Sequence, residues 1–266
     1  SKFMIFFYLE VFMYIYTVNF GNYDRIPNEH FYSKKVKYIC FYNQEIEKKG
    51  EWEYIKINSS KDNKYLSRNF KINFSKYFPK DSNVIYVDCN RVITEKLINF
   101  SFNFFEKNSF GVLKHSARKS LLDELIDWYL ISVADEKDLI NLFKYLKRIR
   151  YMYDQHYCPH CCLILRKNDI QNIQFSKVWW YYYKKFNIRD QLPFTICSLK
   201  LDAKPKLFIN ENLIYTKRHL YSYKKKRRNI KALSNIIKQY NHITNHNINL
   251  TPETLLWRNY KLAKEI

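Results

Sequence analysis

Short apolar stretches recur along most of the chain and alternate with polar segments. Several of these stretches are rich in β-branched or aromatic residues, which pack well on the half-buried surface of a sheet. Their length, and the polar residues that bound them, are typical of strands. The predicted strands are Val11–Val18, Val36–Phe41, Trp52–Ile57, Val84–Val87, Phe110–Leu113, Cys161–Leu165 and Lys206–Ile209.

Two segments between these strands carry apolar residues three and four positions apart, which is the spacing of one helix face. One runs from Leu121 to Tyr129, and the other from Leu139 to Ile149 with Asp135 in position to cap it. Strands that alternate with helices predict an α/β domain with a mixed, mostly parallel sheet covered on both faces. We expect this single domain to span residues 11–214.

The composition changes after residue 214. The basic run Lys224–Arg228 is followed by Thr251-Pro252-Glu253, which is typical of the start of a helix. We therefore predict a basic, mostly helical appendage over residues 215–266. Its positive face would attract an acidic acceptor or an anionic membrane surface.

The first apolar run, Phe3–Phe20, raises the question of a signal peptide or membrane anchor. It carries Glu10 at its centre and only Lys2 as a basic flank, so we interpret its second half as a buried strand. This interpretation predicts a protein that is cytoplasmic or peripheral on the membrane.

The overall composition narrows the class of protein. A hydrophobic fraction of 47% and an aromatic fraction of 18% exclude a disordered chain, and 266 residues are enough for one large core. The net charge of +21 favours anionic partners. The six cysteines fall mostly in apolar runs, which predicts reduced core cysteines. The cluster Cys158–Cys162 lacks the second ligand pair that a structural zinc site needs.

The most informative motif lies at the end of a predicted strand, where Asp88 follows Val84–Val87 and Asn90 stands two positions on. The carboxyl edge of a parallel sheet is where α/β proteins bind ligands, and oxygen ligands suit a divalent cation. Arg68 and Lys71, one helical turn apart, precede this strand and would add positive charge. Alone, the motif also fits an Asx turn, and the two basic residues also fit a solvated helix face.

Taken together, these residues resemble the helix and strand that precede the D-x-D motif of GT-A glycosyltransferases. Three further segments resemble the glycosyltransferase family that includes the plant TOD and MUCI-type proteins, and this similarity runs in order over about Tyr14 to Leu199. The segments are Tyr16–Asp24 followed by Tyr38–Phe41, Gly111–Arg118, and Trp179-Trp180 followed by Arg189–Phe194.

The resemblance implies a GT-A-type, Rossmann-like fold. It also implies metal-dependent transfer of a sugar from a nucleotide-sugar to a glycan, glycolipid or protein hydroxyl, as in polysaccharide biosynthesis, with Mn²⁺ or Mg²⁺ as cofactor. The implied catalytic residues are Asp190 and Gln191, and the implied metal ligands are Asp88, Asn90 and His219. The implied nucleotide-sugar-binding residues are Thr17, Asn19, Asp24, Arg68, Lys71, Lys114, His115 and Arg118.

The chain also departs from the family pattern. Cys89 replaces a glycine that eases backbone approach, and Asn90 replaces an acidic ligand, which implies weaker metal binding. His219 fits a surface histidine in a basic loop as well as it fits a metal ligand. Asp190 is also a candidate helix cap, so that Asp190→Asn is expected to lower turnover with little loss of stability.

Two other functions stay open from the sequence. The net charge of +21, the Lys224–Arg228 run and the abundant tyrosines would suit a nucleic-acid-binding protein, although no recognised nucleic-acid motif accompanies them. The Asn90 departure would suit a degenerate transferase retained as a binding module.

Overall fold

The computed structural model describes residues 13–116, 121–130, 135–149, 158–186, 189–216, 238 and 241–242. The chain divides into two compact units. Among the described residues, the first unit comprises 13–114 and 159–216, and the second includes residues 115–116, 121–130, 135–149 and 158. The sequence did not predict the division after Lys114. The predicted boundary near residue 215 stays a prediction, because most of the chain beyond it lies outside the described residues.

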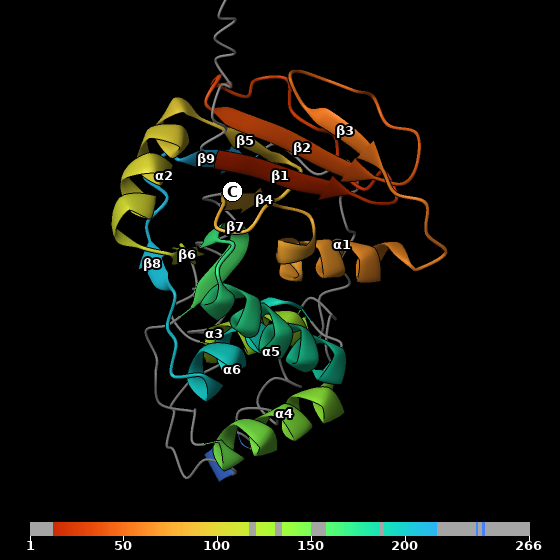
Figure 1. Cartoon of the computed structure of the whole chain (residues 1–266). Coiled ribbons are helices and arrows are strands. Elements are labelled where there is room, and N and C mark those ends of the chain that lie inside the picture. The colour runs from red at the N-terminus through yellow and green to blue at the C-terminus, as the bar shows by residue number, and fades with distance from the viewer. Residues whose placement is uncertain are drawn as a thin grey trace, which may run out of the picture. The chain divides into compact units, whose positions relative to one another are not determined.

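The first unit is built on a seven-stranded sheet with the order β3-β2-β1-β4-β7-β6-β8 (Figure 1). Strand β7 is antiparallel to both β4 and β6, and the other neighbouring pairs are parallel. This confirms the predicted α/β class with a mixed, mostly parallel sheet. The strands are β1 Met13–Asn19, β2 Val36–Tyr42, β3 Glu53–Lys56, β4 Asn83–Val87, β6 Phe110–Lys114, β7 Pro159–Lys167 and β8 Lys206–Phe208. A second sheet pairs β5 Arg91–Ile93 with β9 Ile214–Thr216.

Helices and one short 3₁₀ helix connect these strands. In the first unit they are α1 Asn63–Ile72, η1 Phe74–Lys76, α2 Glu95–Lys107, α5 Ile170–Phe186 and α6 Gln191–Lys200. The second unit contains α3 Leu121–Leu130 and α4 Glu136–Arg148. Asp135 and Asp138 form a capping box at the start of α4, which confirms the predicted cap. No helix in the described part of the chain is both long and apolar enough to cross a membrane.

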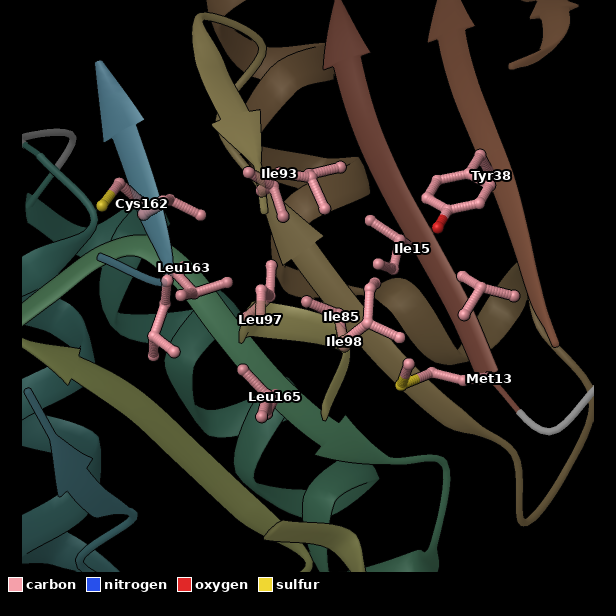
Figure 2. Packing of buried hydrophobic residues seen from close by; sticks show 14 of the residues in the cluster. Met13, Ile15, Tyr38, Ile85, Ile93, Leu97, Ile98, Cys162, Leu163 and Leu165 are labelled. Atoms are coloured by element: carbon pink, nitrogen blue, oxygen red, sulfur yellow. The ribbon is translucent and has the colours of Figure 1, made fainter. Parts of the chain in front are cut away.

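One face of the sheet packs against α2. Met13 and Ile15 of β1 and Ile85 of β4 are fully buried, and they join Leu97 and Ile98 of α2 in one cluster (Figure 2). These positions alternate along their strands, so the residues between them point to the opposite face. The hydrophobic periodicity therefore sets which face of each strand receives a helix.

Aromatic rings fill the opposite face, where α1 packs. Tyr16 of β1 and Phe41 of β2 lie edge to face with 6.3 Å between ring centroids, and the rings of Phe41 and Phe70 of α1 are 4.9 Å apart. Such contacts add to the burial of large apolar surfaces. They hold α1 against the strands whose ends carry the polar residues described below.

The strand order reverses between β1 and β4. The chain leaves β1 on one side to form β2 and β3, and α1 then carries it back to β4 on the other side of β1. All four strands are parallel, so their carboxyl ends share one edge of the sheet. In open α/β sheets, the crevice at such a reversal is the usual ligand site.

Candidate functional site

Asp88 is the first residue after β4 and stands at this reversal point. The hydroxyl of Tyr86 donates a hydrogen bond to Asp88 Oδ1 at 2.8 Å. The backbone N–H of Asp88 donates to the carbonyl of Cys162 on β7 at 2.9 Å. Asn90 follows and is 2% exposed. The carboxylate is thus held in place at the sheet edge.

Helix α1 brings two cations to this edge. Asp62 caps the helix by accepting hydrogen bonds from the backbone N–H groups of Lys64 and Tyr65, each at 2.9 Å. Arg68 and Lys71 are one turn apart and therefore lie on the same helix face.

Arg68 and Lys71 meet Asp88 and Asp190 in a cluster that we call the ionic quartet. Lys71 Nζ lies 2.6 Å from Asp190 Oδ2 and 3.5 Å from Asp88 Oδ1. Arg68 Nε lies 3.6 Å from Asp190 Oδ1. The quartet holds two positive and two negative groups, so its formal charges balance.

The four side chains of the quartet differ in their exposure to solvent. The side chains of Lys71 and Asp190 are 3% and 7% exposed, whereas those of Arg68 and Asp88 are 27% and 35% exposed. A buried ion pair repays its desolvation cost only with good geometry, and removing one partner leaves a buried unpaired charge. A ligand would therefore meet Arg68 and Asp88 first.

The pKa shifts within the quartet keep its four groups charged. Burial raises the pKa of Asp190, but the positive charges of Arg68 and Lys71 lower it by more than burial raises it. The pKa of Asp190 therefore lies below its ordinary value. Burial also raises the pKa of Asp88, and Lys71 and Arg91 more than reverse this. For Lys71, burial lowers the pKa, but Asp190 and Asp88 raise it above its usual value. Asp190 is consequently a poor proton acceptor at neutral pH and a permanent negative charge.

Asp190 occupies the cap position of α6, but its side chain makes no capping hydrogen bond. This corrects the expectation that Asn could replace it as a cap, because the carboxylate is used for the ion pairs instead. Its backbone is fixed separately, since Trp179 Nε1 donates to Asp190 O at 2.9 Å. The adjacent Gln191 donates from Nε2 to Pro159 O at 3.4 Å.

Arg166 on β7 holds the carboxyl end of α1, and sequence reasoning did not find it. It is fully buried and donates to the carbonyls of Lys71 at 2.7 Å and Ile72 at 3.3 Å. It also donates to the hydroxyl of Tyr16 at 3.0 Å. A cation suits the negative end of a helix dipole. The sequence did contain one signal for this role, namely an arginine next to the apolar residues of a predicted strand.

At the end of β1, Asn19 and Asp24 close a loop. Asn19 Nδ2 donates to Asp24 O at 2.7 Å, and Asp24 N donates to Asn19 Oδ1 at 3.4 Å. Gly21 adopts a positive φ of 79° inside this loop, as glycine readily does. Thr17 is buried just before it, and its hydroxyl has no hydrogen-bond partner among the described residues.

A cavity of about 410 Å³ opens beside this loop. Its volume falls in the range of small-ligand sites. Both neutral and charged side chains line it, so it would suit a polar ligand. The lining residues are Asn19, Asn22, Asp24, Arg25, Ile26, Ile46, Glu47 and Lys49.

The solved structures that resemble this fold include two of the galactosyltransferase LgtC. One is a crystal structure of the galactosyltransferase LgtC with donor and acceptor sugar analogues, at 12% identity, 70% coverage of each chain and a TM-score of 0.41. The other is an active-site mutant of LgtC, at 12% identity, 74% coverage of this chain, 72% of that chain and a TM-score of 0.42. Likeness at this level is not by itself evidence of a shared function. No family model and no curated protein sequence matches the chain.

The structure brings together only some of the predicted site residues. Arg68, Lys71, Asp88 and Asp190 form the quartet, and Thr17, Asn19 and Asp24 lie at or just beyond the end of the neighbouring strand. Lys114 ends β6 and is exposed, and His115 belongs to the second unit, where its backbone N–H donates to Cys158 O at 2.9 Å. Arg118 and His219 lie outside the described residues.

The donor groups at this edge determine whether a divalent cation could bind there. Among the described residues, no group of three His, Cys, Asp or Glu side chains could hold a metal ion. Both described contacts of the Asp88 carboxylate go to Oδ1, and the side chain is 35% exposed. Mg²⁺ is commonly held by one or two carboxylates together with substrate phosphates and waters. The residues therefore fit a cation only if a bound molecule or water supplies its remaining oxygen ligands.

The six cysteines are all buried and none forms a disulfide, which confirms their predicted place in the core. Burial raises the pKa of the Cys162 thiol to about 12 and that of Cys161 well above its usual value. Both thiols are therefore protonated at neutral pH, and a neutral thiol is a weak nucleophile and metal ligand.

Proposed function

We propose that this protein is a glycosyltransferase that moves a sugar from a nucleoside-diphosphate sugar to a hydroxyl group. The observation that carries the proposal is the position of the ionic quartet at the reversal point between β1 and β4, on the same sheet edge as the 410 Å³ cavity. A diphosphate needs cations, and a reacting sugar needs a negative charge near its anomeric carbon. The quartet contains both.

In this proposal, the cavity and the two cations bind different parts of the donor. The nucleoside occupies the cavity beside Asn19 and Asp24, and the diphosphate reaches Arg68 and Lys71. These two side chains then neutralise the leaving group, as cations do in other phosphate sites. A divalent cation at Asp88, with Asn90 beside it, would add Lewis-acid assistance to the departing diphosphate.

Asp190 has the role of a fixed negative charge rather than a base. Lys71 and Arg68 pair with its carboxylate in the quartet. When a diphosphate draws those cations toward itself, the carboxylate becomes available to stabilise positive charge that develops on the sugar. This stabilisation is stronger in the transition state than in the ground state, which is the requirement for catalysis. Gln191 would orient the sugar from the adjacent position.

The sequence resemblance to the TOD and MUCI-type family supports the same reading and suggests a GT-A-type transferase. A glycan, glycolipid or protein hydroxyl is the corresponding acceptor. The competing function, nucleic-acid binding, is favoured by the net charge of +21. The quartet adds no net positive charge to that case, because its two cations are balanced by two carboxylates.

Thermal unfolding in the presence of ligands tests the proposal. UDP, GDP and ADP are each added with and without Mn²⁺, and a single-stranded RNA oligonucleotide is tested in parallel over a range of salt concentrations. A transferase should be stabilised by at least one nucleotide, by about 5 °C at a hundredfold excess over Kd. Stabilisation by RNA alone, with a steep salt dependence, would refute the proposal.

Two variants of α1 provide a matched comparison. Arg68→Ala should abolish most of the nucleotide-induced shift, because it removes a cation from the quartet. Lys64→Ala removes the same charge from an exposed position of the same helix and should leave the shift unchanged. An equal loss in both variants would indicate general charge attraction rather than a site.

A further inference from the structure

Three aromatic side chains form a continuous row next to the ionic quartet. Tyr65 of α1 and Trp180 of α5 meet edge to face, with ring centroids 5.3 Å apart and 73° between the planes. Trp180 then stacks on Tyr183, also at 5.3 Å and with only 21° between the planes. We call Tyr65, Trp180 and Tyr183 the aromatic row.

The row leads directly to the quartet. Tyr65 and Arg68 are one turn apart on α1, so they share a face of that helix. At the other end of the row, Tyr183 is buried, and the charges of both Arg68 and Asp190 act on its hydroxyl. Trp179, which precedes Trp180 in α5, holds the backbone of Asp190. The adjacent tryptophans therefore have separate tasks, one inside the core and one in the row.

The row is open to solvent at its outer end. Tyr65 is 36% exposed and Trp180 is partly exposed, whereas Tyr183 is 3% exposed. Stacked aromatic rings that could bury more of their surface indicate a site for a ligand with a flat apolar face. The adjoining charges require that the same ligand also carries polar groups. A pyranose ring meets both conditions, because its C–H groups form a flat face and its hydroxyls form the rim.

The order of groups along the site distinguishes acceptor from donor. In the proposed function, the nucleoside occupies the cavity, the diphosphate lies at Arg68 and Lys71, and the reacting carbon lies at Asp190. Tyr65, Trp180 and Tyr183 do not line that cavity, and the row reaches the quartet through Tyr183, near Arg68 and Asp190. A sugar ring held on the row would therefore lie beside the reacting carbon and apart from the nucleoside of the donor.

We propose that Tyr65 and Trp180 form the binding surface for a sugar ring of the acceptor. This inference rests on the proposed function and narrows the acceptor to a glycan or a glycosylated molecule. A nucleobase could also stack on such a row, but the balanced charge of the adjoining quartet disfavours a polyanionic chain.

Saturation-transfer NMR on the full chain tests the surface with small probes. Methyl glycosides of glucose, galactose, mannose and N-acetylglucosamine are titrated into the wild-type protein and its variants. At least one glycoside should receive saturation on its ring C–H protons. Its Kd should rise about tenfold in Tyr65→Ala and in Trp180→Ala, which is the scale of losing one stacked ring. Tyr65→Phe keeps the ring and should bind normally. Tyr181→Ala removes a tyrosine of α5 that is 57% exposed and outside the row, and it should also bind normally.

Each contrary result has a specific meaning. If no glycoside binds, or if Tyr65→Ala binds as tightly as the wild type, the surface is not a sugar site. Tyr65 is exposed, so this variant remains informative even if Trp180→Ala does not fold. Displacement of the bound glycoside by UDP or GDP would assign the row to the donor and overturn the acceptor assignment. RNA binding that is lost in both row variants would assign it to nucleic acid. Failure of every nucleotide in the thermal-shift experiment would instead reject the proposed function.

Discussion

Replacing Asp190 by Asn tests the physical description of the site most directly. The substitution keeps the size of the side chain and removes its charge. Lys71 and Arg68, which lie 2.6 and 3.6 Å from the two carboxylate oxygens, then lose a shared counter-ion. Asp88 stays 3.5 Å from Lys71, but its side chain is 35% exposed and it cannot replace both contacts.

The expected cost follows from burial. Lys71 and Asp190 have side chains that are 3% and 7% exposed, so solvent screens their interaction little. Removing one partner of a buried ion pair destabilises a protein by about 3–5 kcal/mol. This is a large part of the roughly 5–15 kcal/mol that stabilises a typical domain. No capping hydrogen bond offsets the loss, because the Asp190 side chain makes none.

Urea unfolding at pH 7 measures the effect, and the midpoint should fall by on the order of 1 M or more. The pH dependence has a definite sign. The pKa of Asp190 is lower in the folded protein than in the unfolded chain, so its contribution is fully present above the unfolded pKa of about 4 and is lost as the pH falls through the folded pKa. The difference between wild type and variant should therefore be constant near neutrality and shrink in acid.

Asp62→Asn is the matched control, because it makes the same chemical change at a residue that does cap a helix. Asn is as good a cap as Asp, so this variant should lose less than about 0.5 kcal/mol. A loss below about 1 kcal/mol for Asp190→Asn, or one that does not vary with pH below pH 4, would refute the role assigned to the ion pairs.

Three further substitutions have defined outcomes. Asp88→Ala should abolish the Mn²⁺-dependent part of nucleotide affinity in calorimetry while the far-UV circular dichroism stays unchanged; unchanged affinity would contradict the metal assignment. Arg166→Met should destabilise the protein by about 2–4 kcal/mol in urea unfolding, because it leaves the buried carbonyls of Lys71 and Ile72 at the end of α1 without their hydrogen-bond donor. An unchanged stability would mean that water replaces the guanidinium. Gly111→Ala should cost about 1–3 kcal/mol, since a Cβ would lie 2.4 Å from Phe104 Cζ, and a smaller loss would show that this ring can move aside.

Much of the fold could be predicted from local patterns. The seven strands of the main sheet were each signalled by a short stretch of apolar, β-branched or aromatic residues, because such residues pack well on the surface of a sheet. Asp135 was recognised as a cap because its partner groups are within one helical turn. Asp88 was placed at a sheet edge because a polar residue directly after a buried strand must lie there.

Other elements had no such local signal. β5 and β9 are three residues each, too short for an alternating pattern, and they exist because they pair with each other. Helix α2 is different, because it was not predicted although a local signal is present: its buried residues Leu97, Ile98, Ser101, Phe104 and Phe105 have helical spacing, and Thr94 caps its first turn.

The candidate site divides in the same way. The sequence alone determined that Arg68 and Lys71 share a helix face and that Asp88 follows a strand, because both relations depend on nearby residues. Tertiary structure decided that Asp190 meets Lys71, that Arg166 holds the end of α1, and that Asp190 is a charge partner rather than a cap. Ion pairs between distant segments depend on how helices and strands pack, and packing is a property of the whole sheet rather than of any single stretch of chain.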